Sequence, residues 1–142
     1  MTTWAPTEAQ KTIFNTLSQD ATLQTLLGTT PLNPKVFDHI PDNQPFPYIK
    51  IAIKPMADRA NEQWDGVSFQ YQIDTYLQGG DLGDKKVQQI QQRIDVLLHQ
   101  EDICIDGWNI IVHRRSTVDI LDEPDGRTKH GVQIFKLFLG EV

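Results

Sequence analysis

The sequence lacks a long apolar run and a pair of cysteines. No segment approaches the roughly 20 apolar residues that a membrane-spanning helix needs, so we expect no membrane partner. The single cysteine, Cys104, excludes a disulfide within one chain, and its place between two isoleucines predicts a buried, unreactive thiol. The N-terminus shows neither the basic leader nor the apolar core of a secretory signal, so we expect the protein to be made in the cytosol.

Basic residues are also scarce. The chain of 142 residues has 13 Lys and Arg against 19 Asp and Glu, a net charge of −6. A protein that grips nucleic acid must neutralise several phosphates, so a primary DNA-binding role is not expected. Hydrophobic residues at 39% and charged residues at 23% are typical of a globular protein. This length predicts a single domain over residues 1–142.

Catalytic and metal-binding signatures are missing as well. No two histidines have the spacing that builds a metal site locally, and there is no Gly-x-Ser-x-Gly elbow. The glycine-rich stretch 79–86 lacks the Walker spacing and predicts an ordinary turn, with Asp81 or Asp84 capping a helix. We therefore predict no catalytic residue, no metal and no cofactor. A small α+β enzyme or ligand-binding domain that uses Asp38 and His39, or His113, stays open as the alternative.

Three helices are predicted. Thr7 is a plausible N-cap for the first, whose apolar residues recur at spacings of three and four. Asp20 is expected to cap a short second helix that Gly28 ends. The third, in residues 84–100, has the clearest apolar stripe of the chain: Val87, Ile90, Ile94, Leu97 and Leu98.

Alternating side chains predict the strands. A short strand in 35–40 precedes a long hairpin made of 48–55 and 67–77, with a polar tip between them. A second hairpin is expected from 108–120 and 130–140, with Trp108, Ile110 and Val112 pointing inward. The resulting order is helix, helix, short strand, hairpin, helix, hairpin. It predicts an α+β fold, a mostly antiparallel β-sheet with helices packed on one face.

Prolines crowd the approach to the first long strand. In "HIPDNQPFPYIKI", residues 39–51, Pro41, Pro45 and Pro47 fix φ and favour extended neighbours. We expect an ordered, extended arm that reaches a partner, with Phe46 among its contact residues.

An acidic connection separates the last two strands. The stretch "DILDEPDGRTK", residues 119–129, lacks the ligand spacing of a calcium loop, and its Pro-Asp-Gly sequence favours a plain hairpin turn. Connections of this kind often carry contacts. The candidate contact residues here are Asp122, Glu123, Asp125 and Arg127.

Taken in order, these pieces resemble the tail-completion, or tail-terminator, proteins of long-tailed bacteriophages and prophages. The likeness runs through "LQTLLGTTPLNPKVFDHIPDNQPFPYIKI", the strand "VSFQYQIDTYL", the helix "VQQIQQRIDVLL" and the hairpin "LDEPDGRTKHGVQIFKLFL". It covers nearly the whole chain and depends on the order and spacing of its motifs together.

The resemblance implies a structural virion protein without enzymatic activity. Such a protein assembles as a ring, commonly a hexamer, on the finished tail tube and offers a docking surface to the neck or head-completion protein. The implied partners are other copies of the chain, the tube protein and the neck protein, with DNA passing through without specific binding. The implied location is the virion tail or neck, after assembly in the host cytoplasm. Another head-tail connector component is the alternative within this context.

Overall fold

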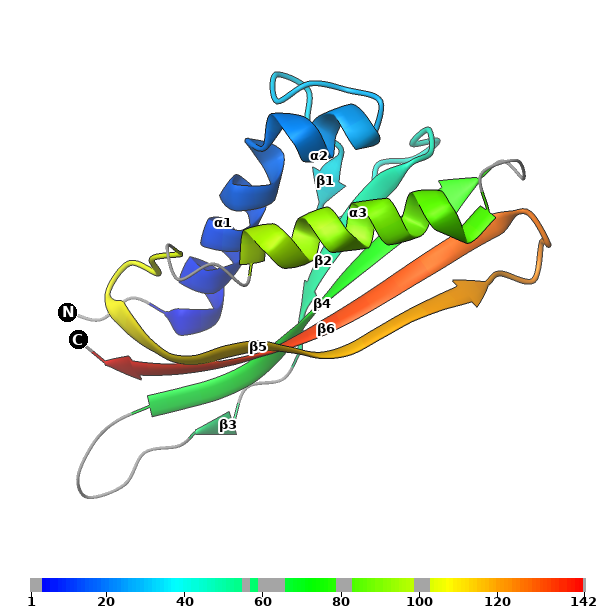
Figure 1. The fold of residues 1–142 in the computed structure, drawn as a ribbon. Coiled ribbons are helices and arrows are strands. Elements are labelled where there is room, and N and C mark those ends of the chain that lie inside the picture. The colour runs from blue at the N-terminus through cyan, green and yellow to red at the C-terminus, as the bar shows by residue number, and fades with distance from the viewer. Residues whose placement is uncertain (1–3, 55–56, 59–65, 79–82, 99–102, 142) are drawn as a thin grey trace.

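The computed structural model describes residues 4–54, 57–58, 66–78, 83–98 and 103–141. These residues form three helices and one sheet. Figure 1 shows the helices lying against the twisted sheet. The helices are α1 (Ala5–Ser18), α2 (Ala21–Leu26) and α3 (Gly83–Leu98). The strands are β1 (Val36–Phe37), β2 (Tyr48–Ile53), β3 (Ala57–Asp58), β4 (Gly66–Gln78), β5 (Trp108–Asp122) and β6 (Thr128–Glu141). The predicted order of elements is confirmed.

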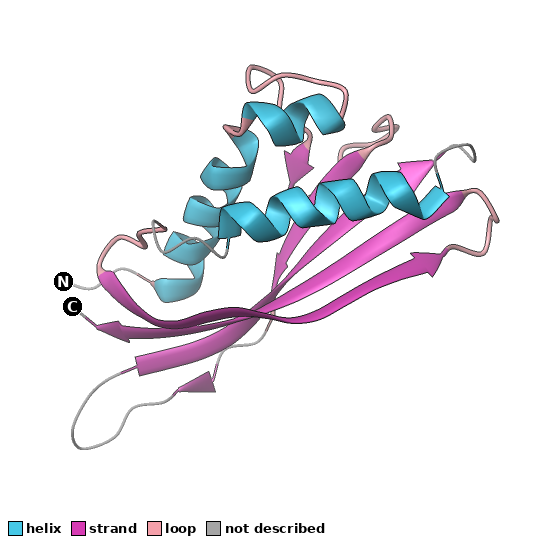
Figure 2. Ribbon diagram, in the orientation of Figure 1, coloured by secondary structure: helices cyan, strands magenta, loops and turns pink. Residues whose placement is uncertain are grey.

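The sheet has the strand order β1-β2-β4-β6-β5, and β3 pairs with one end of β4. Within the described residues, β1 and β2 are the one parallel pair, and all other neighbouring strands are antiparallel. The predicted α+β fold with a mostly antiparallel sheet is therefore confirmed (Figure 2). β3 is a short strand inside the segment that we predicted as a polar tip, most of which lies outside the described residues.

All three helices cover the same face of the sheet (Figure 1). The stripe predicted for α3 is buried there, with Val87, Ile90, Ile94 and Leu98 fully inaccessible. Ile90, Ile94 and Leu98 share one core cluster with side chains from β2, β4 and β6, including Ile51, Tyr71 and Phe135. The side chains that alternate with these strand residues point to the other side of the sheet, which we call the open face. No helix in the described residues is long and apolar enough to cross a membrane.

The first helix begins earlier than predicted. Its N-cap is Trp4, which makes no side-chain cap hydrogen bond, so Thr7 lies inside the first turn rather than at the cap. Pro6 explains the difference, because its missing N–H and fixed φ suit the first turn of a helix. The second helix follows the prediction: the Asp20 carboxylate accepts a hydrogen bond from the Leu23 N–H at 2.8 Å, and Gly28 ends the segment with φ +75°.

The start of α3 differs slightly from the prediction. Asp84 lies in the first turn of the helix, not at the cap, and Asp81 lies outside the described residues. An acidic side chain in this first turn still interacts favourably with the helix dipole.

Strand β5 departs from simple alternation. The register with β6 shifts between Ile110 and Val112 and again between Arg115 and Thr117. The first shift places an extra residue in β5, so Val112 pairs with Phe138 on the open face and is 39% exposed. The prediction that Val112 points inward is wrong for this reason, while the inward positions of Trp108 and Ile110 are confirmed by their packing on the core.

The prediction of a buried Cys104 is also wrong, because its side chain is exposed. Its neighbour Ile105 fills the core instead and is 4% exposed. Only one of two adjacent side chains can face the core where the chain enters the sheet, and here it is the isoleucine.

Candidate docking surfaces

The proline arm is folded against the edge of the sheet. The ring of Phe46 lies 5.2 Å from that of Tyr48, and the ring of Phe37 lies 6.4 Å from Tyr48 in an edge-on arrangement. Pro45 and Pro47 flank Phe46, and the Phe46–Pro47 peptide bond is cis. Pro41 is exposed farther along the arm. Contrary to our prediction, the arm is not extended throughout: it turns at Asp42 and Asn43, where Asn43 has φ +59°. Its aromatic residue, Phe46, anchors it to β2.

A row of stacked rings continues from the arm across the open face. Tyr48 stacks on Tyr76 of β4 at 5.2 Å, and Tyr76 stacks on His130 of β6 at 4.4 Å. The three residues are direct cross-strand partners. Stacked aromatic pairs add stabilisation beyond the area that they bury. We call Phe46, Tyr48, Tyr76 and His130 the ring row.

The acidic turn between β5 and β6 is held by its own side chains. The carboxylate of Asp125 accepts hydrogen bonds from the N–H groups of Arg127 and Thr128, both at 2.8 Å, and from the Thr128 hydroxyl at 2.6 Å. These bonds lower the pKa of Asp125, the one from the Thr128 hydroxyl most. Gly126 has φ +71°, as the predicted turn requires.

Two further ion pairs join this turn to the sheet and to α3. The Lys129 ammonium contacts Asp122 at 2.5 Å and Asp84 at 3.2 Å. Both contacts raise the pKa of Lys129, that with Asp122 most. The acidic side chains that we predicted as contacts thus also fix the shape of the turn.

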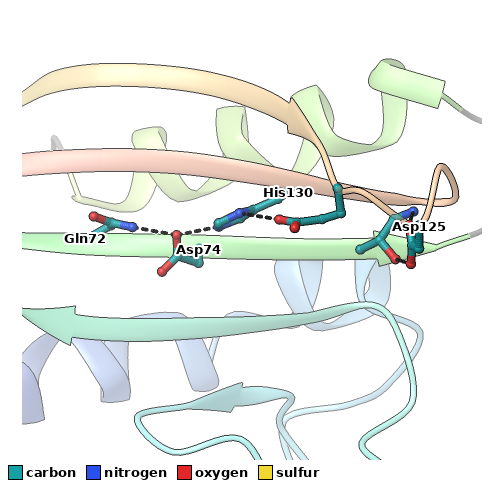
Figure 3. A network of polar contacts seen from close by, with 6 residues as sticks. Gln72, Asp74, Asp125 and His130 are labelled. Carbon is teal, nitrogen blue, oxygen red and sulfur yellow. Dashed lines mark hydrogen bonds and ion pairs between the residues drawn. The ribbon is translucent and has the colours of Figure 1, made fainter.

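His130 connects the ring row to the acidic turn. Its Nε2 lies 2.7 Å from Asp74 Oδ1, and its Nδ1 lies 2.9 Å from Glu123 Oε1. Asp74 also accepts a hydrogen bond from Gln72 at 2.7 Å (Figure 3). Because each ring nitrogen faces a carboxylate oxygen, the imidazolium form, which has two N–H donors, satisfies both contacts.

The structure therefore brings the two predicted contact segments to one end of the sheet. Phe46 of the arm and Glu123 of the turn lie at opposite ends of one continuous chain of contacts through the ring row. We call this end of the molecule the arm–turn end. Of the predicted residues, Pro45, Phe46, Pro47, Asp122, Glu123 and Asp125 make or flank these contacts, while Pro41 and Arg127 are exposed beside them.

Sequence reasoning missed the residues that join the two segments. Burial raises the pKa of Tyr48, and burial together with the nearby Asp74 raises that of Tyr76 to about 12. Both phenols therefore stay neutral to a higher pH than ordinary phenols and present O–H groups. The signal in the sequence was an aromatic residue at the solvent-facing positions of two adjacent strands, where polar residues are usual.

The residues of the alternative enzyme hypothesis, His113 and Asp38 among them, make contacts within the fold. The His113 Nε2 hydrogen-bonds the hydroxyl of Tyr71 under α3. Asp38 accepts a hydrogen bond from Gln10 at 3.4 Å in a groove beside α1. The described part of the chain contains no group of three or more His, Cys, Asp or Glu placed to hold a metal ion.

The fold has a counterpart among solved structures. A chain in a solved structure described as the virion of a native gene transfer agent particle has the same fold, with a TM-score of 0.80 and 15% sequence identity. The likeness covers 96% of this chain and 97% of that one. Among curated proteins, none matches the sequence significantly.

The sequence itself identifies the family. The profile of the family described as tail completion protein gp17 matches residues 11–139, and the chain belongs to this family. The resemblance on which we based the expected function is confirmed. The protein has a structural role in the tail of a phage or phage-like particle.

Proposed function

We propose that this protein caps the tail tube as a ring, commonly of six copies, and offers a docking surface to the neck or head-completion protein. The single observation that carries the proposal is the family match over residues 11–139. The proposed partners are other copies of this chain, the tube protein and the neck protein. The role needs no catalytic step and no cofactor, and it belongs to assembly of the virion in the host cytoplasm.

The arm–turn end supports the proposal physically. Its contact residues are held before any partner arrives, Phe46 by ring contact with Tyr48 and the acidic turn by its own hydrogen bonds. A preorganised surface loses less conformational entropy on docking than a flexible one. We therefore propose that Pro41, Pro45, Phe46, Pro47 and the turn residues Asp122, Glu123, Asp125 and Arg127 contact a neighbouring subunit, the tube or the neck.

Electron microscopy of particles made without the protein tests this role. The gene is disrupted in its parent phage or prophage, and a plasmid copy of the intact gene serves as the control. We expect DNA-filled heads beside separate tails, some of abnormal length, and rescue by the plasmid. Intact, joined particles of normal length in the disrupted strain would contradict the proposal.

A further inference from the structure

A row of basic side chains crosses the middle of the open face. Cross-strand pairing places Gln70 of β4 beside Lys136 of β6, and Lys136 beside Arg114 of β5. The Lys54 N–H donates to the Gln70 carbonyl at 2.7 Å, which puts Lys54 at the same level on the other side of β4. We call Lys54, Lys136 and Arg114 the basic row.

The basic row is accessible and carries uncompensated charge. Lys136 and Arg114 are exposed and Lys54 is half-buried, on a face that no helix covers. Among the described residues, none forms an ion pair with any of the three. By contrast, Arg93, Arg115 and Lys129 all pair with carboxylates on or near the helical face. Lys85 and Lys86 on α3 and Arg127 in the acidic turn also make no ion pair among the described residues. The basic row differs from them because its three cations lie in line across the bare sheet.

The dimensions of the row suit a phosphodiester backbone. Neighbouring strands lie about 4.8 Å apart, so the row from β2 to β5 spans about 15 Å. Phosphates on one DNA strand advance by about 3.4 Å along the helix axis, so the row covers about four of them. Lys, Arg and polar side chains make most phosphate contacts in protein–DNA complexes, and Gln70 lies within the row.

A protein partner fits this part of the face less well. The cores of protein interfaces are depleted of lysine and are centred on aromatic or apolar anchors. On one side of the basic row the open face carries Ala52, Gln72, Ile134 and Thr117. On the other side it carries Ser68, Phe138 and Val112, so among these residues the row is flanked by a single aromatic ring and not by a cluster of anchors.

We propose that the basic row contacts the phosphate backbone of DNA weakly and without regard to sequence. The inference deepens the proposed function, because it assigns the open face to the side of the ring that meets DNA. Because the three cations belong to a chain with 19 carboxylates, their attraction to DNA is weak, and the DNA stays mobile.

Fluorescence anisotropy of a labelled 20-base-pair duplex tests the inference on the full chain. We expect binding at low salt that weakens with a slope of log K against log salt of about −2.7, from three phosphate contacts. The triple variant Lys54→Gln, Lys136→Gln, Arg114→Gln should weaken binding at least about tenfold. The matched control Lys11→Gln, Lys85→Gln, Lys86→Gln removes the same charge from the helices and should leave binding unchanged.

Three outcomes overturn the inference: no binding at low salt, equal loss in both triple variants, or tighter binding of poly-glutamate than of the duplex. The last would identify an acidic protein surface as the occupant. This test is independent of the test of the proposed function. Duplex binding is measured on the purified protein, whereas the proposed function is tested by whether disruption of the gene separates heads from tails.

Discussion

The guanidinium of Arg93 on α3 forms two hydrogen bonds to the carboxylate of Asp20, at 2.9 Å and 2.7 Å. The same carboxylate caps α2 through the Leu23 N–H. One side chain therefore both starts the second helix and fastens it to the third. Planar two-point pairs of this kind are stronger than single charge contacts.

Replacing Asp20 with Ala should destabilise the fold by about 2 kcal/mol, because both the cap and the ion pair are lost. Asp20→Asn should cost less, since Asn caps helices equally well but leaves Arg93 without its partner charge. Urea unfolding measures both. The exposed pair Glu8–Lys11, 3.8 Å apart, is the control, and Lys11→Ala should change the unfolding free energy by under about 0.5 kcal/mol. Equal losses in all three variants would contradict this assignment.

The same pair predicts a pH dependence of stability. Hydrogen bonds from Arg93 lower the pKa of Asp20 below its usual 3.8 in the folded state. A carboxyl group with a lowered folded pKa stabilises the fold fully above its unfolded pKa. This contribution should be lost as the pH falls from about 4 through the folded pKa. Unfolding free energies of the wild type and Asp20→Asn should converge there; a constant difference down to pH 2 would contradict the linkage.

Gly131 of β6 is predicted to tolerate no side chain. A Cβ there would lie 2.7 Å from Gln91 Nε2 and 2.8 Å from Val87 Cγ1, both on α3. Gly131→Ala should therefore destabilise the fold by roughly 1–3 kcal/mol, measured by thermal or urea unfolding. Gly140 in the same strand is the control, because its Cβ would meet only the exposed tip of Ile111. Similar losses at both positions would show that helix packing is not the cause.

A buried charge on α3 should unfold the domain. Ile94 is fully inaccessible, so Ile94→Asp places an unpaired carboxylate in the core at a cost of about 4 kcal/mol or more. Val96 lies two residues away and is 42% exposed, so Val96→Asp should leave the protein folded. Circular dichroism separates the two outcomes. A folded Ile94→Asp protein would contradict the packing of this helix.

Loss of Asp125 should loosen the turn without unfolding the sheet. Asp125→Ala removes three hydrogen bonds, so the amides of Arg127 and Thr128 should exchange with solvent faster. Hydrogen exchange followed by NMR reports this directly, and the amides of β4 serve as the internal control. Unchanged exchange at both turn amides would show that the carboxylate does not hold the turn.

The arm should matter for assembly rather than for folding. Pro45→Gly with Pro47→Gly increases the freedom of the unbound arm, so we expect a folded protein that joins heads to tails less efficiently. Complementation of the disrupted phage measures joining, and Pro31→Gly, in another exposed loop, is the control. Normal joining by the double variant would remove the arm from the docking surface.

Much of the fold could be predicted because local and tertiary preferences agree. The stripe on α3 and the alternation of β4 each match the face that becomes buried. Val112 could not be placed, because a β-bulge is decided by pairing with β6 and leaves no periodic signal in β5.

The proline arm and the acidic turn were each predicted as contact segments, but their proximity was not predicted. The residues around Phe46 and Glu123 do not show that Tyr48, Tyr76 and His130 are cross-strand neighbours. That depends on the register of the whole sheet.

The strand order determines when, during synthesis of the chain, the sheet can form. β6 is the last described strand to be synthesised, yet it lies between β4 and β5 and pairs with both along nearly its whole length. Until it emerges, β5 has no neighbour and the core lacks Phe135, Leu137 and Leu139. A nascent chain therefore cannot complete its sheet early. A premature stop before residue 128 would leave one edge of β4 and both edges of β5 unpaired and prone to aggregation.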